Sequence, residues 1–115
     1  MVDSEECKKA LRAFAVALAS YLRRNARRTI SIASIVGQDR VKISVRALMR
    51  EHDPSTGFFR FMDVLGTIRR CGEDLLESRG FKMLIVDGEI YFEVGLELLK
   101  KLIDMKLDDL ISYFT

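Results

Sequence analysis

The first quarter of the chain repeats apolar side chains at helical spacing. Asp3 followed by Glu6 has the pattern of a capping box, which predicts a helix that begins near residue 4. Its apolar positions are separated by intervals of three and four residues, as one buried stripe of a helix requires. These positions are Cys7, Leu11, Phe14, Leu18 and Leu22. The pattern predicts that this helix ends near residue 26.

Two short segments after this helix have the character of strands. Residues 29–36, TISIASIV, are rich in β-branched side chains, which favour strands. Residues 41–45, VKISV, alternate apolar and polar side chains, as a half-buried strand does. The turn residues GQDR separate the two segments, so we expect the strands to pair and to place Lys42 and Ser44 on their outer face.

A short helix is expected directly after the second strand. Ser44 can cap its first turn, and it would run from Val45 to about His52. Arg46 and Arg50 lie four residues apart and would share its exposed face. The segment HDPSTG that follows is the clearest loop in the chain.

Two longer helices are predicted in the second half of the chain. Residues 58–78 would form the first, closed by Gly80, because glycine is favoured just beyond a helix end. The segment Leu96–Phe114 has apolar residues at helical spacing and predicts one amphipathic helix. Its stripe could pair with a partner helix, which would make a homodimer.

A β-hairpin separates these two helices. Asp87-Gly88 lies between the apolar segments 81–86 and 89–94, and this dipeptide is a strong signal for a type I′ turn. The resulting register places Lys82 opposite Glu93, an attractive cross-strand pair.

The segments together predict an α+β fold, with about four helices and a small four-stranded antiparallel sheet that includes the hairpin. A length of 115 residues suits one domain, residues 1–115. Hydrophobic residues make up 49% of the chain and charged residues 31%, a composition typical of globular rather than disordered proteins.

The composition also narrows the cellular setting. No apolar run approaches the roughly 20 residues that span a bilayer, and no secretion signal is evident, so we expect a soluble, cytoplasmic protein without membrane contact. Cys7 and Cys71 are far apart and lack a CxxC motif, which favours two buried thiols over a disulfide or zinc site; whether they ever pair stays open. Asn25 and Gln38 are the only side-chain amides, a scarcity that suggests a thermophilic source.

Charge is distributed unevenly along the chain. The formal net charge is +2, but residues 1–60 carry 12 basic and 6 acidic side chains, whereas residues 61–115 carry 7 and 11. Within residues 21–50, eight basic side chains accompany Asp39 alone. One or two arginines would complement the dipole at the end of the first helix, but four arginines between residues 23 and 28 exceed that need. A concentrated basic segment is the electrostatic footprint of a phosphate-binding surface.

No catalytic or cofactor-binding signature accompanies this charge. His52 is the single histidine and has no nucleophile motif beside it, and the glycines form no phosphate-binding loop. Acidic pairs such as Asp108-Asp109 are typical of solvated helix faces. We therefore expect a non-enzymatic protein with no cofactor and no metal site.

Aromatic residues beside the basic segment suggest how a nucleic acid could be held. Phe59 falls on the polar side of its predicted helix, next to Arg60, as a base-stacking platform requires. Tyr91 lies on the less apolar face of the hairpin. The candidate nucleic-acid-binding residues are Arg23, Arg24, Arg27, Arg28, Lys42, Arg46, Arg50, Phe58, Phe59, Arg60, Phe61 and Tyr91.

The element order resembles two families of nucleic-acid-binding protein. Helix, strand, short helix, loop, helix and DG hairpin resemble a winged helix-turn-helix domain, which would make residues 58–78 the groove-binding helix and 81–94 the wing. Arg60, Arg69 and Arg70 would then be candidate contacts to duplex DNA. Two features depart from that family: a helix of about 21 residues is long for groove insertion, and its start is aromatic.

The same elements and the basic half are similar to the archaeal ThermoDBP family of single-stranded-DNA-binding proteins and its shorter relatives. That resemblance implies a cleft with a floor from Phe58, Phe59, Phe61 and Tyr91. It also implies a basic rim, formed by Arg23, Arg24, Arg27, Arg28, Lys42 and Arg46. The chain lacks the C-terminal leucine zipper of the larger members.

The sequence thus predicts a non-catalytic protein that binds nucleic acid, preferably single strands of DNA or RNA, with little sequence specificity. A dimeric winged-helix regulator of duplex DNA is the first alternative. A protein-interaction module that uses the Leu96–Phe114 helix is the second.

Overall fold

A computed structural model describes residues 3–115, with the side chains of all of these except Ala26 and Thr29. The fold is α+β, as predicted. The described residues form five α-helices, α1 (Ser4–Ile35), α2 (Val45–Arg50), α3 (Phe61–Cys71), α4 (Leu96–Ile103) and α5 (Leu107–Phe114), and three strands, β1 (Arg40–Ser44), β2 (Lys82–Val86) and β3 (Glu89–Gly95). Two short 3-10 turns cover Pro54–Thr56 and Glu77–Arg79.

The prediction of a strand at residues 29–36 was wrong, because α1 continues through them for 32 residues in all. No glycine or proline interrupts the chain before Gly37, where φ is +73°. Once a helix has formed, extending it costs little, and this outweighs the weak strand preference of isoleucine. Ala33, 3% exposed, also continues the buried stripe beyond Leu22.

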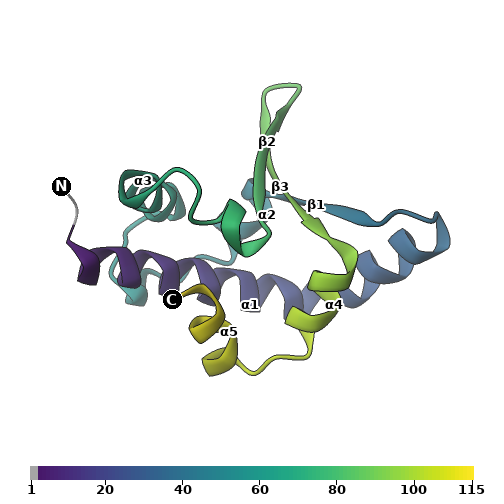
Figure 1. Cartoon of the computed structure of the whole chain (residues 1–115), viewed down its shortest axis with the longest axis horizontal. Helices are drawn as coiled ribbons and strands as arrows, with labels where there is room; N and C mark the ends of the chain where they lie inside the picture. Colours follow the sequence, from purple (N-terminus) through teal and green to yellow (C-terminus); the bar gives the residue numbers. More distant parts are fainter. Residues whose placement is uncertain (1–2) are drawn as a thin grey trace.

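The sheet therefore has three strands instead of the expected four. Its order is β1-β3-β2, and both pairings are antiparallel. The hairpin prediction is confirmed: Asp87 and Gly88 both have positive φ, at 51° and 79°, and Lys82 lies opposite Glu93. β1 pairs with β3 rather than with residues 29–36, which places Ile43 beside Phe92. The hairpin of β2 and β3 rises away from the helices (Figure 1).

Two of the predicted helices are interrupted. The helix expected over 58–78 is confined to the 11 residues of α3, which ends at Gly72. Leu76 then turns back into the core, and its carbonyl accepts a hydrogen bond from the N–H of Phe81. The helix expected over Leu96–Phe114 is divided into α4 and α5 by a turn at residues 104–106. The apolar spacing carries on across that turn, so periodicity alone does not reveal the change of direction.

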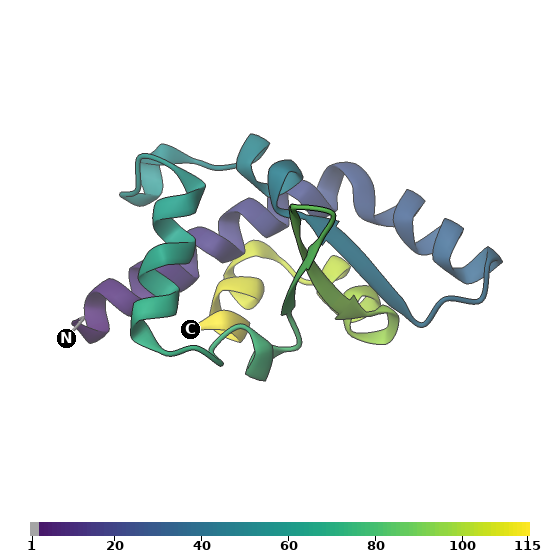
Figure 2. The ribbon, with the colours of Figure 1, turned by 90° about the horizontal axis from the view of Figure 1, so that it is seen from above.

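Helix α1 is the central element of the core. It runs along the long axis of the molecule and contacts α3, α4 and α5 (Figures 1 and 2). In the view of Figure 1, α3 and the hairpin lie above α1 and α5 lies below it. Phe14 of α1 is fully buried. Its ring lies 5.2 to 6.1 Å from four other phenylalanine rings, measured between centroids. These rings belong to Phe61, Phe81, Phe92 and Phe114.

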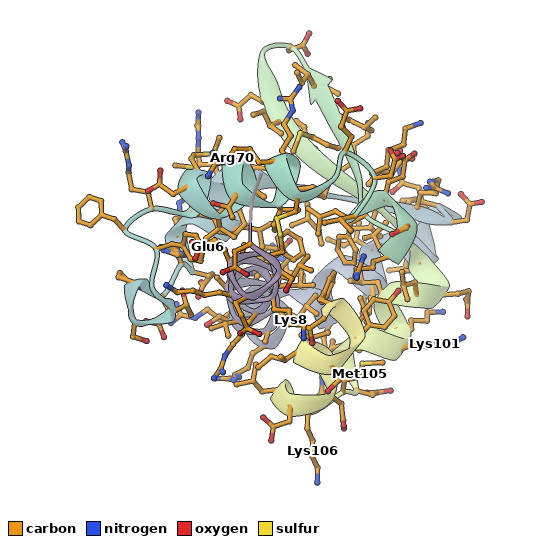
Figure 3. The ribbon with its side chains drawn as sticks, turned by 60° about the vertical axis from the view of Figure 1, so that its left-hand side comes forward. Glu6, Lys8, Arg70, Lys101, Met105 and Lys106 are labelled. Carbon is orange, nitrogen blue, oxygen red and sulfur yellow. A yellow bond between two sulfur atoms is a disulfide. The ribbon has the colours of Figure 1, made fainter. Side chains whose placement is uncertain are left out.

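A disulfide joins Cys7 of α1 to Cys71 at the end of α3, so the expectation of two free thiols was wrong. The two cysteines are 64 residues apart in sequence, so local sequence patterns do not predict their contact. Packing of α3 against α1 brings the two Cα atoms to 6.0 Å, within the range that a disulfide bridges. Figure 3, in which α1 is seen end-on, shows α3 lying across it at this point. Within residues 3–115, no helix has the length and apolar character needed to cross a bilayer.

Candidate nucleic-acid interface

The second half of α1 presents its arginines to solvent. Leu22 faces the core at this level with 4% exposure. Arg23, Arg24, Arg27 and Arg28 are all exposed. At a rise of 1.5 Å per residue they occupy about 7.5 Å of the helix axis, so their guanidinium groups are concentrated in a short length of surface.

Helix α2 extends this basic region. The Nε of Arg24 lies 3.6 Å from Oε1 of Glu51, the residue that follows α2. The Glu51 side chain is only 13% exposed, and it holds the end of α2 against α1. Arg50, directly before it, is exposed. We call these five residues, Arg23, Arg24, Arg27, Arg28 and Arg50, the arginine surface.

The arginine surface is largely unneutralised. Within the part of the chain that the structure describes, Arg24 is its one member with an acidic partner within 4 Å. Arginines that form no ion pair inside the protein are available to bind an external anion, and a guanidinium binds phosphate through two hydrogen bonds.

Two further predicted basic residues, Lys42 and Arg46, lie among acidic side chains of the sheet. Arg46 of α2 donates to Glu89 over 3.0 Å, and Arg40 donates to Glu93 over 2.7 Å. Lys42 lies opposite Glu93 in the register of β1 and β3. Lys42 and Arg46 therefore add little net positive charge, and Arg50 is the predicted residue of this group that joins the arginine surface.

The aromatic floor expected from sequence is not assembled. Phe58 and Phe61 lie in the core, 7% and 2% exposed, because the chain turns inward at the start of α3. The ring of Phe61 stacks against Phe14. Tyr91 is half-buried and lies between Ser44 and Leu84 in the sheet. Of the four aromatic residues predicted to form the floor, Phe59 is the one whose ring is largely exposed to solvent, at 83%.

Arg60 lies directly before α3 and is tied to its first turn. Its backbone N–H donates to Oδ2 of Asp63 over 3.2 Å, and its Nε lies 3.9 Å from the same atom. Its side chain is nevertheless 73% exposed. Phe59 and Arg60 thus form a small exposed aromatic and basic pair at the beginning of α3.

His52 has a structural position in the loop between α2 and α3. Its Nε2 lies 2.7 Å from the carbonyl oxygen of Phe58, to which it can donate a hydrogen bond. Its Nδ1 is buried and has no hydrogen-bond partner in the described part of the chain. The next residue, Asp53, caps the turn Pro54–Thr56. Hydrogen bonds from Ser55, first from its side chain and then from its backbone N–H, lower the pKa of the Asp53 carboxyl group. No group of three or more potential metal ligands is present among the described residues.

A second surface feature, which sequence patterns did not reveal, is a groove between α3 and the hairpin. Its volume is about 570 Å³. Methionine and aliphatic side chains form most of its walls, and both acidic and basic side chains stand at its margin. The apolar lining includes Met62, Leu65, Ile68, Leu76, Met83, Ile85 and Ile90, and the charged residues are Arg69, Glu73, Glu77 and Lys82.

Comparisons with protein-family models, with curated proteins and with solved structures found no match to this chain.

Proposed function

We propose that this protein binds nucleic acid without catalysis, and that the arginine surface holds the phosphate backbone of a duplex. The observation that carries the proposal is the combination of five exposed arginines from two adjacent elements with a single, mostly buried acidic partner, Glu51. Phosphate contacts of this kind supply affinity with little sequence preference. Low sequence specificity is therefore expected.

The arrangement of the elements supports a duplex over a single strand. The element order α1, β1, α2, α3 and hairpin is the order on which the winged helix-turn-helix resemblance rests. An 11-residue α3 removes the objection that this helix is too long to enter a groove. Single-strand binding would depend on stacking platforms, but Phe58 and Phe61 are committed to the core.

The phosphate contacts are better assigned to the arginine surface than to the hairpin. Asp87 lies in the hairpin turn and is exposed, and its charge repels a polyanion. Arg69 and Arg70 of α3 are exposed and could add contacts. The acidic side chains of Asp63 in α3 and Glu73 just after it offset the positive charge of Arg69 and Arg70.

Single-strand binding is the second candidate, favoured by one specific observation. Phe59 exposes 83% of its surface beside Arg60, and an exposed ring has no role in packing. In this case the bound strand would stack a base on Phe59, and the arginines would hold its backbone.

Competition binding separates the two candidates. A labelled duplex and a labelled oligo-dT of equal length would be titrated with the protein at two salt concentrations. The variant Arg27→Glu/Arg28→Glu should lose duplex affinity at least about tenfold, because two phosphate contacts become repulsive. The matched control is Lys101→Glu/Lys106→Glu, which makes the same change in net charge on two exposed lysines outside the arginine surface (Figure 3).

Each outcome decides between the candidates. Preference for duplex, with loss in the arginine variant alone, supports the proposal. Preference for oligo-dT replaces it with the single-strand candidate. An equal loss of duplex affinity in the arginine and lysine variants would mean that net charge alone, and not the arginine surface, determines binding. No binding at low salt would exclude nucleic acid as the partner.

A further inference from the structure

Strand β2 forms an edge of the sheet. In the order β1-β3-β2 it pairs with β3 on one side, and no other strand of the described residues pairs with it on the opposite side. Its sequence is KMLIV, in which four of the five residues are apolar and all but the half-buried Leu84 are exposed. Such an edge invites another strand, and proteins usually protect it with charges, proline, a bulge or a covering element. Lys82 is the one charge in β2.

The apolar edge is continuous with the groove beside α3. Ile85 and Met83 stand on the inner face of the hairpin, 72% and 45% exposed, and both line the groove. Met62 on the α3 side is 41% exposed. An unpaired strand edge and an exposed apolar lining therefore belong to a single surface, which a strand with apolar side chains would cover.

The charges around this surface argue against a polyanion and do not oppose a copy of the same chain as the occupant. Arg69 and Lys82 are balanced by Glu73 and Glu77, so the margin has no net charge and does not attract a polyanion. A second copy brings the same balanced set of charges. It also brings a second unprotected edge with the same side chains.

We propose that two copies of this chain associate by antiparallel pairing of their β2 strands, centred on Leu84. This register places Met83 of one copy opposite Ile85 of the other, twice, on the inner face above the grooves. Lys82 falls opposite Val86 of the other copy, so no like charges face each other. The two sheets then form one continuous six-stranded sheet, and the interface is isologous, as two-fold dimers require.

The C-terminal helices are a poor alternative interface. Leu99, Leu102, Leu110 and Phe114 are at most 2% exposed, because α4 and α5 pack their apolar sides against α1. The apolar side of Leu96–Phe114, from which the sequence suggested a homodimer, therefore packs against α1 of the same chain. Dimerisation through β2 does not depend on the proposed binding of nucleic acid.

The oligomeric state tests this proposal. Sedimentation of the wild-type protein over a range of concentrations should show a dimer that dissociates on dilution. Ile85→Lys should raise the dissociation constant of the dimer about tenfold or more, because it puts a charge at the centre of the buried surface. The matched control is Ile35→Lys at the end of α1, a position that is 83% exposed and distant in the fold; it should leave the dimer intact.

A cross-linking experiment tests the register itself. Both native cysteines are in the disulfide, so one added cysteine reports without interference. Leu84→Cys should form an intermolecular disulfide under mild oxidation, since directly opposed residues have Cβ atoms about 4.5–5.5 Å apart. Met49→Cys, at an exposed position of α2, should not form this disulfide.

A wild-type monomer at all concentrations would overturn the proposal. So would a dimer that Ile35→Lys disrupts while Ile85→Lys does not. A dimer that is sensitive to Ile85→Lys but fails to cross-link through Leu84→Cys would overturn the register. Circular dichroism of each variant would show that the fold is retained.

Discussion

Arg24 and Glu51 join the solvent side of α1 to the end of α2, with 3.6 Å between Nε and Oε1. Glu51 exposes 13% of its side chain, whereas Arg24 exposes 74%. The mostly buried carboxylate of Glu51 therefore contacts the Arg24 guanidinium on its protein side, and the guanidinium remains accessible to solvent. Among the described residues, it is the one carboxylate within 4 Å of the arginine surface.

Removal of that carboxylate should strengthen nucleic-acid binding. Glu51→Gln keeps the shape of the side chain and removes its charge. We expect affinity at low salt to rise about two- to fivefold, the equivalent of roughly 0.5–1 kcal/mol, and the free energy of unfolding to fall by less than about 1 kcal/mol. Fluorescence anisotropy with a labelled duplex measures the affinity. Weaker binding would mean that the anchoring of Arg24 matters more than the charge of Glu51.

Replacement of Phe59 should distinguish single-strand from duplex binding. The ring is 83% exposed, so Phe59→Ala should leave the melting temperature nearly unchanged. If single strands are bound, the variant should lose about 1–3 kcal/mol of binding free energy to oligo-dT. Under the duplex proposal its duplex affinity should stay close to wild type. Met49→Ala, at an exposed position of α2, is the control for general loss of surface hydrophobicity.

Loss of the disulfide should weaken the fold. The bond between Cys7 and Cys71 closes a loop of 64 residues, and constraint of such a loop in the unfolded chain is worth about 4 kcal/mol in the entropic account. Cys7→Ser/Cys71→Ser should lower the free energy of unfolding by about 2–4 kcal/mol, as measured by urea denaturation. In strong reductant, the wild-type protein should have the same free energy of unfolding as the double variant. A wild-type free energy of unfolding that reductant does not change would contradict the disulfide.

The turn at Pro54–Thr56 should stabilise the protein less in acid. Hydrogen bonds from Ser55 hold the pKa of Asp53 below its usual value, so the folded state favours the charged carboxylate. This contribution is complete above the unfolded pKa of about 3.9 and is lost as pH falls through the lower folded pKa. The difference in free energy of unfolding between wild type and Asp53→Asn should therefore shrink between pH 7 and pH 3. A difference that grows in acid would contradict this sign.

The sequence predicted features that are determined within a few residues. The Asp87-Gly88 turn fixed the register of Lys82 with Glu93, because turn chemistry alone selects that pairing. The cap at Ser44, with its hydroxyl 3.4 Å from the N–H of Ala47, is likewise local. The class α+β followed from such local signals.

Features that depend on tertiary packing could not be read from the sequence. The β-branched residues at 29–36 indicated a strand, but the helix that precedes them continues to Ile35. Phe58 and Phe59 are neighbours with opposite roles, and only the turn at the start of α3 decides which ring is buried. The groove beside α3 and the contact of Cys7 with Cys71 arise when elements far apart in sequence pack together.

The position of α1 also constrains the order in which the protein can fold during synthesis. Phe14 is made early, yet one of the rings that encloses it belongs to Phe114, a hundred positions later. Helices α4 and α5, which cover one side of α1, leave the ribosome after every other element of the described chain. The part of α1 that α4 and α5 cover is therefore buried only after the last residues of the described chain have been made.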